Sequence, residues 1–374
     1  MSDYRQDADA GFLREALDLA REGRAQASPN PLVGAVLVRD GRVVGRGFHT
    51  WAGVKHAEIL ALEQAGELAR GATLYINLEP CCHQGRSGPC TAALIQAGVG
   101  RVEAALEDPN PLVAGEGLRQ LRAAGIPARI AGEFSAEAER LNEAFVHFMR
   151  TRLPLVTLKT ALTLDGKIAA PDDNRGWITS ERARAHVQQL RHDSDAILTG
   201  IGTVLADDCL LTDRTGLPRS RPLLRIVLDS RLRLPLDSKM VRTAGQDVLV
   251  VGTSAAPADR RKALENRGIE VLILDGRDGR SDLHGAIEAV AQRKYVSVLI
   301  EAGAKVNWAA LETSVADKIF FYYAPKILGG LESLSMAGGV GRRRRADAIR
   351  VDRTQLHSIA PDEFVLEGYV VKED

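Results

Sequence analysis

The chain has 374 residues, of which 45% are hydrophobic and 26% are charged, and its 49 basic side chains balance 49 acidic ones. This composition is typical of a globular protein, and the length suggests two or three domains, each large enough to bury its own core. The zero net charge gives no overall attraction to nucleic acid or to a membrane surface, and no apolar run approaches the roughly 18 residues of a membrane span. The first ten residues lack the pattern of a secretion signal, so we expect a cytoplasmic enzyme.

The first 150 residues predict a mixed sheet covered by helices. Two apolar runs at 33–38 and 43–48 predict strands, and the Asp40-Gly41 step between them predicts a hairpin turn. The other expected elements are a helix over 12–22, a helix over 56–69, a strand over 73–78, a helix after Pro89, a strand over 101–106, and then a helix, a strand and a long helix that ends near Arg150. A hairpin followed by alternating helices and strands is typical of an α/β domain.

A second series of elements begins after TRLP at 151–154, the expected domain boundary. Near-continuous apolar runs predict the buried strands of a largely parallel sheet, with helical segments between several of them. These expected strands cover 155–162, 196–200, 223–229, 247–252, 271–274, 296–300, 318–325 and 363–371. We therefore expect two α/β domains, spanning 1–150 and 151–374.

Residues 56–90 hold the pattern that points most directly to chemistry. HAE supplies the imidazole of His56 and the carboxylate of Glu58, and PCCHQGRSGPC supplies the thiols of Cys81 and Cys90. One imidazole and two thiolates give zinc three ligands and leave a fourth position for water, which then acts as a nucleophile near neutral pH. A carboxylate beside the metal can carry a proton to a departing amine. The pattern predicts a zinc enzyme that deaminates a cyclic amidine by hydrolysis.

The expected helix starts at His56 and Cys90 favour this interpretation, because the partial positive charge of a helix N-terminus lowers the pKa of a thiol. One alternative is a structural zinc with four protein ligands, in which Cys82 or His83 is the fourth. Another is that the cysteines are reduced and buried as small apolar groups. We expect Cys82 to point away from the metal.

The second domain carries weaker signals, which suggest nucleotide binding. Gly303 lies between an expected strand and an expected helix, where helix N–H groups can bind a pyrophosphate. Ser230 and Arg231 follow a strand, and this pair suits the 2′-phosphate of NADPH. We expect the arginine run at 342–345 to lie in a solvated loop, and we expect the thiol of Cys209 to be packed inside the domain.

Several motifs between residues 10 and 371 belong together. They are SPNPLVGAV, HAE, LEPCCHQGRSGPC, EDPNPLVAGEG, LKTALTLDGKIA, GWITS, GTVLADD, LLRIVLDS, LIEAG and YYAPKILGG. This set resembles the RibD family of bifunctional riboflavin-biosynthesis proteins. The resemblance implies a cytidine-deaminase-like three-layer α/β/α domain followed by a dihydrofolate-reductase-like α/β domain. It implies zinc-dependent deamination of 2,5-diamino-6-ribosylamino-4(3H)-pyrimidinone 5′-phosphate, and then NADPH-dependent reduction of the ribosyl group to ribityl.

The resemblance also implies a role for each matching residue. In the deaminase domain His56, Cys81 and Cys90 hold the zinc and Glu58 is the proton shuttle. The implied substrate contacts in that domain are Asn30, His49, His83, Arg86, Asp108 and Asn110. The implied NADPH contacts in the reductase domain are Ala161, Trp177, Thr203, Asp207, Ser230 and Gly303. The implied substrate contacts there are Lys159, Arg175, Arg191, Leu211, Arg214 and Glu301.

Some of these assignments have simpler alternatives. Asn30 and Asn110 each precede a proline and are also candidates for turn residues. Arg191 and Arg214 suit a phosphate monoester as guanidinium clamps, but solvated surface arginines are the alternative. Lys159 and Glu301 both remain candidates for the proton donor of the reduction.

Two other functions remain open from the sequence. An RNA-editing deaminase needs basic grooves with stacking aromatic side chains, whereas this chain is 5% aromatic and neutral overall. A zinc-stabilised binding protein, whose second domain senses a nucleotide, would release no ammonia. We expect one zinc per chain, a small pyrimidine ribotide phosphate as substrate, no nucleic-acid or membrane partner, and a homo-oligomer.

Overall fold

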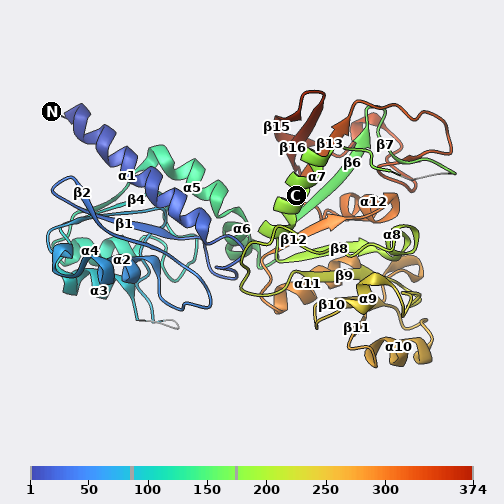
Figure 1. Ribbon diagram of the computed structural model, residues 1–374, viewed down its shortest axis with the longest axis horizontal. Helices are drawn as coiled ribbons and strands as arrows, with labels where there is room; N and C mark the ends of the chain where they lie inside the picture. Colours follow the sequence, from blue (N-terminus) through green and yellow to red (C-terminus); the bar gives the residue numbers. More distant parts are fainter. Residues whose placement is uncertain (1, 85–87, 173–175, 373–374) are drawn as a thin grey trace. The chain divides into compact units, whose positions relative to one another are not determined.

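The structure is a computed structural model that describes residues 2–84, 88–172 and 176–372, with side chains from residue 9 onward. The chain divides into two compact units (Figure 1). The first contains Met1–Arg152 and Pro218–Arg221, and the second contains Leu153–Leu217 and Pro222–Asp374. In the part of the chain that the structure describes, no helix combines the length and the hydropathy that a bilayer crossing requires.

The first unit is built on a sheet of strands β1 (Gly34–Arg39), β2 (Arg42–Phe48), β3 (Thr73–Ile76), β4 (Arg101–Ala104) and β5 (Ala128–Ile130). Their order across the sheet is β2-β1-β3-β4-β5. β1 is antiparallel to both β2 and β3, while β3, β4 and β5 run parallel. Asp40 and Gly41 have positive φ angles of 51° and 74°, which suits the two central residues of a tight hairpin turn. The predicted hairpin is confirmed.

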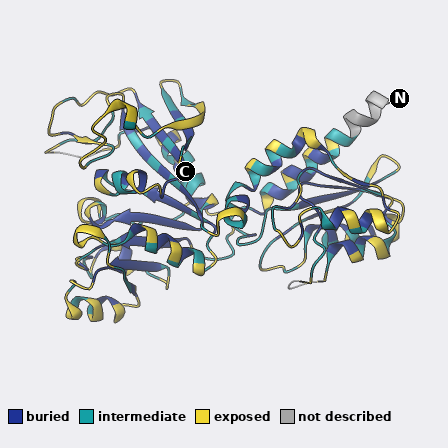
Figure 2. Cartoon of the chain, turned by 180° about the vertical axis from the view of Figure 1, so that it is seen from behind, coloured by how far each residue is buried: buried dark blue, intermediate teal, exposed yellow. Residues whose placement is uncertain are grey.

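Helices cover both faces of this sheet. They are α1 (Ser2–Glu22), α2 (Ala57–Ala65), α3 (Cys90–Ala97), α4 (Glu116–Ala123), α5 (Ser135–Leu141) and α6 (Glu143–Thr151). Successive side chains of β1 point to opposite faces. Ala35 and Leu37 therefore pack with α2, α3 and α4, while Val36 and Val38 pack with α1 and α5. Figure 2 shows the buried strands between helices whose outer sides are exposed. The expected α/β/α layering is confirmed.

Two glycines of β2 let α2 lie close to the sheet. A Cβ atom at Gly45 would lie 2.1 Å from the backbone oxygen of Ala61, and one at Gly47 would lie 2.3 Å from that of Ala57. Any side chain at these positions would push α2 away from the strand. Because α2 begins directly after His56, this close contact fixes where the start of the helix lies.

The second unit contains strands β6 (Leu155–Thr163), β7 (Lys167–Ala169), β8 (Ala196–Gly200), β9 (Leu224–Leu228), β10 (Val248–Gly252), β11 (Glu270–Ile273), β12 (Ser297–Glu301), β13 (Lys318–Ala324), β14 (Leu334–Ser335), β15 (Val351–Ala360) and β16 (Glu363–Val370). The main sheet has the order β11-β10-β9-β8-β12-β6-β13-β16-β15, and β14 pairs with β7 separately. In this order, all strands from β11 across to β13 run parallel to one another. β16 and β15 add an antiparallel edge. The carboxyl ends of the parallel strands thus lie along one edge, where α/β folds form their ligand crevices.

Helices also cover both faces of the larger sheet. They are α7 (Glu181–Asp193), α8 (Ile201–Asp207), α9 (Lys239–Arg242), α10 (Ala258–Glu265), α11 (Leu283–Gln292) and α12 (Ala304–Glu312). α11 and α12 pack on one face, and α8, α9 and α10 pack on the other. α7 packs beside β13 and β16, where Ala183 and Val187 contact Tyr322 and Val365.

The structure differs from the expected elements in a few places. The first helix begins at Ser2, although residues 2–11 show no clear apolar spacing. The long helix expected before residue 150 is two helices, α5 and α6, with Asn142 between them. β15 was not predicted, because its side chains are mostly exposed and form no apolar run.

Candidate active sites

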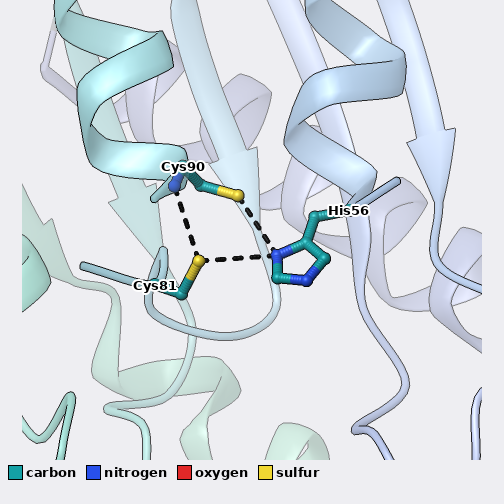
Figure 3. A group of neighbouring side chains, drawn as sticks. All are labelled: His56, Cys81 and Cys90. Carbon is teal, nitrogen blue, oxygen red and sulfur yellow. Dashed lines mark hydrogen bonds between the residues drawn. The ribbon is translucent and has the colours of Figure 1, made fainter. Parts of the chain in front are cut away.

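Two helix starts bring three metal-binding side chains together in the first unit (Figure 3). His56 directly precedes α2, Cys90 is the first residue of α3, and Cys81 lies between β3 and α3. Nδ1 of His56 lies 3.4 Å from Sγ of Cys81 and 3.2 Å from Sγ of Cys90, and the three ligand atoms all lie within 4.8 Å of one another. Tetrahedral zinc with its usual bond lengths separates a nitrogen and a sulfur ligand by about 3.5 Å. The cluster therefore fits a zinc ion.

The charges of the two thiols also favour a cation at this cluster. A hydrogen bond with Cys90 lowers the pKa of the Cys81 thiol to about 4 against the effect of burial, and the bond with His56 lowers it further. The hydrogen bond with Cys81, together with burial, raises the pKa of the Cys90 thiol. Two thiolates this close together repel each other, so the second ionises readily only when a cation lies between them.

Glu58 lies buried in the first turn of α2, next to the cluster. Burial raises the pKa of its carboxyl group to about 7, and the negative charge of Cys81 adds to this effect. Among the described residues, Oε2 of Glu58 has no hydrogen-bond partner. A carboxyl group with this pKa can both accept and donate a proton near neutral pH.

Two of the expected substrate residues form a hydrogen-bonded pair beside the cluster. His49 is buried, and its Nε2 lies 2.9 Å from the side-chain amide nitrogen of Asn30. The amide nitrogen donates, so Nε2 accepts and Nδ1 carries the proton that it donates to the backbone oxygen of Lys55 at 2.9 Å. The ring of His49 lies edge-on to that of His56, with 5.2 Å between the ring centres. Asn30 therefore orients a neutral imidazole next to a cluster residue.

A third histidine and a second thiol lie on the segment that follows Cys81. Nδ1 of His83 is buried and has no hydrogen-bond partner within the described parts of the chain. Sγ of Cys82 lies 3.6 Å from the backbone oxygen of Leu112, outside the group formed by His56, Cys81 and Cys90. Neither residue belongs to this three-residue cluster.

Asp108 and Asn110 lie on the loop between β4 and α4. Oδ1 of Asp108 accepts a hydrogen bond from the backbone N–H of Asn110 at 2.8 Å, and Oδ1 of Asn110 accepts one from Leu112 at 3.2 Å. Burial raises the pKa of the Asp108 carboxyl group to about 7. Both side chains therefore shape the loop, as the turn-residue alternative for Asn110 predicts, while Asp108 is also a buried group that titrates near neutral pH.

In the second unit a largely buried carboxylate joins two basic side chains. Glu301 ends β12 and lies beside Lys159 of β6 in the parallel ladder. Arg191 of α7 donates from Nε and Nη2 to the two oxygens of Glu301 at 2.6 and 3.0 Å, and Nζ of Lys159 lies 3.4 Å from one of them. Burial alone would raise the pKa of Glu301, but the charges of Lys159 and Arg191 outweigh it and hold this pKa at about 2. Glu301 is therefore an anion at physiological pH.

The two arginines expected to clamp a phosphate lie in different surroundings. Arg191 is only 9% exposed, and its Nη1 also donates to the backbone oxygen of Thr212, next to Leu211, at 3.2 Å. It is thus not a solvated surface arginine, and several of its N–H groups are engaged with protein oxygens. Arg214 is exposed, and its backbone N–H donates to the side chain of Gln188.

Of the residues expected to bind NADPH, Gly303 lies just after the carboxyl end of β12. Gly303 directly precedes α12, and a Cβ atom there would meet nothing within 4 Å except Oγ1 of Thr203, at 3.9 Å. Gly303 thus carries no side chain at this helix start, where backbone N–H groups can bind a pyrophosphate. Trp177 is 69% exposed and stacks against the guanidinium of Arg184 at 5.0 Å.

The other expected cofactor residues lie on β6, on α8 and just after β9. Ala161 lies in β6 opposite Tyr322 of β13, and Asp207 is the exposed last residue of α8. Ser230 follows β9, and its hydroxyl accepts a hydrogen bond from the backbone N–H of Ser281 at 2.9 Å. Ser230 therefore already has a protein partner.

Two family models match the chain in series. The cytidine and deoxycytidylate deaminase zinc-binding region matches residues 6–106, and the RibD C-terminal domain matches residues 154–363. Curated relatives match almost the whole chain. The riboflavin biosynthesis protein RibD of Actinobacillus pleuropneumoniae is 39% identical over 368 residues, which cover 98% of this chain and 96% of the relative. The chain belongs to the RibD family.

Further relatives support the same assignment. The RibD of Escherichia coli is 39% identical over 365 residues, which cover 95% of this chain and 97% of that protein. A solved structure of Acinetobacter baumannii RibD has a TM-score of 0.86, with 37% identity and coverage of 98% of this chain and 99% of that one. A Thermotoga maritima structure, described as a diaminohydroxyphosphoribosylaminopyrimidine deaminase/5-amino-6-(5-phosphoribosylamino)uracil reductase, has a TM-score of 0.82, with 32% identity and coverage of 98% and 100%.

Membership of the RibD family confirms the main expectations from the sequence. The chain is a riboflavin-biosynthesis enzyme with a deaminase domain and a reductase domain, each of the expected α/β class. The zinc-binding deaminase region contains the His56, Cys81 and Cys90 cluster, and NADPH is the cofactor of the RibD reductase domain. Arg86 and Arg175, two expected substrate contacts, lie outside the described residues.

Sequence reasoning missed a residue that organises the deaminase site. Glu79 is buried between the end of β3 and Cys81, and its Oε2 accepts hydrogen bonds from the backbone N–H groups of Asp108 and Gly115 at 3.2 and 2.8 Å. Its Oε1 accepts a third from Leu118 at 3.0 Å. Glu79 thus fixes the loop that carries Asp108 and Asn110. The available signal was a charged residue placed between an apolar strand and a metal-binding cysteine.

Two asparagines were also missed. Asn77 and Asn142 bind the backbone of the segment that follows Asn30. Oδ1 of Asn142 accepts from the N–H of Leu32 at 2.7 Å, and both asparagine side chains donate to the oxygen of Leu32, at 2.8 and 3.0 Å. The sequence gives no spacing that would connect these two asparagines, because residue 142 lies 110 positions after Leu32.

Proposed function

We propose that the protein carries out two reactions in series on a pyrimidine ribotide. The first is hydrolytic deamination of 2,5-diamino-6-ribosylamino-4(3H)-pyrimidinone 5′-phosphate. The second is NADPH-dependent reduction of the ribosyl side chain, which gives 5-amino-6-ribitylamino-uracil 5′-phosphate. The observation that carries the proposal is the buried carboxyl group of Glu58, whose Oε2 has no partner among the described residues, beside a His–Cys–Cys cluster in a chain that also has a RibD reductase domain.

The deamination uses the cluster and Glu58 together. His56, Cys81 and Cys90 hold the zinc, which when bound makes a water molecule nucleophilic near neutral pH. Glu58 accepts a proton from the attacking water and delivers it to the exocyclic amine. The C–O bond forms first, as water adds across the C=N bond of the ring and its other proton goes to the ring nitrogen. The C–N bond to the exocyclic amine then breaks, and ammonia leaves. A pKa of about 7 supports both halves of this proton transfer, because the group is then poised to accept and to release a proton.

The polar groups around the cluster orient the pyrimidine ring. We assign substrate contacts to Asn30, His49 and His83 on one side and to Asp108 and Asn110 on the facing loop. The unpartnered Nδ1 of His83 supports its role, since a buried ring nitrogen without a partner is costly unless a ligand pairs with it. The hydrogen bond between Asn30 and His49 supports a fixed orientation of both side chains before substrate binds.

The reduction takes place at the carboxyl ends of β6 and β12. NADPH supplies the hydride when bound. We assign its pyrophosphate to the start of α12, at Gly303 and Thr203, and Ala161, Trp177, Asp207 and Ser230 complete the assigned cofactor contacts. The opened ribose, as an imine, accepts hydride at its first carbon, and the imine nitrogen takes up a proton.

We assign Lys159, Arg191, Leu211, Arg214 and Glu301 to the substrate of this second reaction. Arg191 acts by holding Glu301 through both carboxylate oxygens, which leaves Lys159 with a longer and weaker bond of 3.4 Å. The Lys159 ammonium is therefore the most available donor of the three groups, and Arg214 is the exposed guanidinium that can approach the phosphate. Because the pKa of Glu301 is about 2, this carboxylate is ionised near neutral pH. It is therefore not the group that holds the proton before the reduction.

We place the enzyme in the cytoplasm, because Cys81, Cys82, Cys90 and Cys209 are all free thiols and the cluster needs two of them reduced. We also propose a homo-oligomer. The exposed ten-residue edge strand β15 supports this, since an unpaired edge readily pairs with another chain.

A coupled assay tests the proposed function. The zinc-loaded protein is mixed with the diamino substrate, and ammonia and NADPH absorbance are followed separately. We expect ammonia release without NADPH, and NADPH oxidation that begins only as deaminated product accumulates. A protein that releases no ammonia from this substrate contradicts the deaminase assignment, and one that releases ammonia but never oxidises NADPH contradicts the reductase assignment.

A further inference from the structure

Lys159 lies between an acidic group and an aromatic ring. On one side its Nζ lies 3.4 Å from Oε2 of Glu301, and on the other it lies 5.7 Å from the centre of the Tyr322 ring. This is within the distance over which an ammonium group is attracted to an aromatic face. The Lys159 side chain is 14% exposed, so this attraction is weakly screened by water. Both contacts therefore determine where the ammonium group lies.

The Tyr322 ring is itself fixed by a histidine of α7. Its hydroxyl lies 2.7 Å from Nδ1 of His186, and Tyr322 is 1% exposed. Burial raises the pKa of the Tyr322 hydroxyl and lowers that of the His186 imidazole, so both groups are neutral near pH 7 and the bond between them carries no net charge.

The same helix thus reaches both neighbours of Lys159. His186 binds Tyr322 near the middle of α7, and Arg191 binds Glu301 near its end. Lys159, Tyr322 and Glu301 lie on three adjacent strands, β6, β13 and β12. The helix and the sheet therefore enclose the lysine from two directions while its ammonium group keeps N–H groups that neither neighbour takes.

We propose that Tyr322 and His186 are positioning residues of the reductase, in which His186 holds the Tyr322 ring and the ring fixes the Lys159 ammonium toward the substrate. This inference rests on the proposed function, in which Lys159 contacts the substrate. Tyr322 and His186 act through Lys159 and touch neither substrate nor cofactor.

The test measures reductase kinetics on pre-deaminated substrate in the full-length, zinc-loaded protein. Tyr322→Phe keeps the ring but loses its bond to His186, and we expect kcat/KM for the substrate to fall about fivefold while KM for NADPH stays unchanged. Tyr322→Leu removes the ring, and we expect a fall of about thirtyfold. His186→Leu should match Tyr322→Phe, whereas His186→Asn, which retains a polar group near the position of Nδ1, should restore most of the activity.

Combination with Lys159→Met separates positioning from a general structural effect. Tyr322→Phe should cause no further loss in the Lys159→Met background, because the group that it positions is gone. The same fivefold loss in both backgrounds would overturn the inference. Unchanged kcat/KM in Tyr322→Phe would also overturn it. So would a loss of kcat/KM in His186→Asn as large as that in His186→Leu.

Two controls keep the outcomes distinct. Tyr323→Phe removes the neighbouring hydroxyl, on the opposite face of β13 where Tyr323 stacks on Phe364, and should leave the reductase unchanged. Deaminase activity should be normal in every variant, and an unchanged KM for NADPH shows that the reductase unit has folded. If Lys159→Met alone leaves kcat/KM unchanged, the proposed role of Lys159 has failed and the inference falls with it; if that variant is impaired but the losses are additive, only the inference fails.

Discussion

Nδ1 of His56 lies 3.2 Å from Sγ of Cys90, although the two residues are 34 positions apart in the chain. Each stands at the start of a helix, and the two helices pack against the same face of the sheet. The backbone therefore brings a nitrogen and a sulfur ligand to the separation that tetrahedral zinc requires. Cys81 completes the group from the segment after β3.

The first prediction concerns the metal. The native protein should contain one zinc per chain, and Cys90→Ala should lose it, because a histidine and a single thiolate bind zinc weakly. Deaminase activity should fall by about 10³-fold or more, since the nucleophilic water depends on the ion. Elemental analysis and ammonia release provide the measurements.

Cys82→Ala is the matched control for this substitution. The Cys82 sulfur lies 3.6 Å from the oxygen of Leu112 and outside the cluster. The variant should keep its zinc and its deaminase activity. Loss of zinc in Cys82→Ala, or full zinc content in Cys90→Ala, would show that the ligand set is wrong.

The second prediction concerns the contact between α2 and the sheet. In Gly47→Ala the new Cβ atom would lie 2.3 Å from the backbone oxygen of Ala57, so α2 must move and carry His56 with it. We expect a loss of about 2–3 kcal/mol in the free energy of unfolding and a lower zinc content. Gly11→Ala is the control, because nothing lies within 4 Å of its Cβ position in α1 and alanine favours a helix. Equal zinc content in both variants would contradict the role of this contact.

The third prediction concerns Glu79. Glu79→Ala leaves the backbone N–H groups of Asp108, Gly115 and Leu118 without their acceptor, which should cost about 3 kcal/mol and loosen the loop. Hydrogen–deuterium exchange over residues 106–118 should accelerate, and KM for the diamino substrate should rise. Glu107→Ala removes an exposed carboxylate from the same loop and should change neither quantity. Unchanged exchange in Glu79→Ala would refute the proposed role.

The fourth prediction concerns pH. The folded-state pKa of Glu301 is about 2, below the ordinary glutamate value of 4.5, so the group stabilises the fold above pH 4.5 and loses this effect as pH falls toward 2. The difference between these two pKa values corresponds to about 3 kcal/mol in the free energy of unfolding. The difference in unfolding free energy between the native protein and Glu301→Gln should thus be constant above about pH 5 and fall by roughly half by pH 3. Urea unfolding at a series of pH values measures it, and a difference that does not change with pH would contradict the account.

The sequence predicted the deaminase core and the cluster well because their signals are local. The Asp40-Gly41 turn lies between two apolar runs, and the ligands of the cluster lie within 35 residues on two short motifs. Strands buried on both faces, such as β8 and β10, are apolar throughout and were readily predicted.

Other features could not be predicted because they depend on contacts that are distant in the sequence. β15 carries mostly exposed polar side chains and is a strand only because β16 pairs with it. Glu79 and Asn142 act on backbone groups 29 to 110 positions away, for which no spacing rule exists. The bond between Tyr322 and His186 joins residues 136 positions apart, and only Tyr322 lies in one of the motifs.

The central claim is that one chain carries two chemically separate sites, with Glu58 serving only the first. The most direct measurement is to assay Glu58→Gln for ammonia release from the diamino substrate and for NADPH oxidation with pre-deaminated substrate. We predict that ammonia release is abolished while NADPH oxidation continues at the native rate. A parallel loss of both activities in a folded, zinc-containing variant would contradict the account.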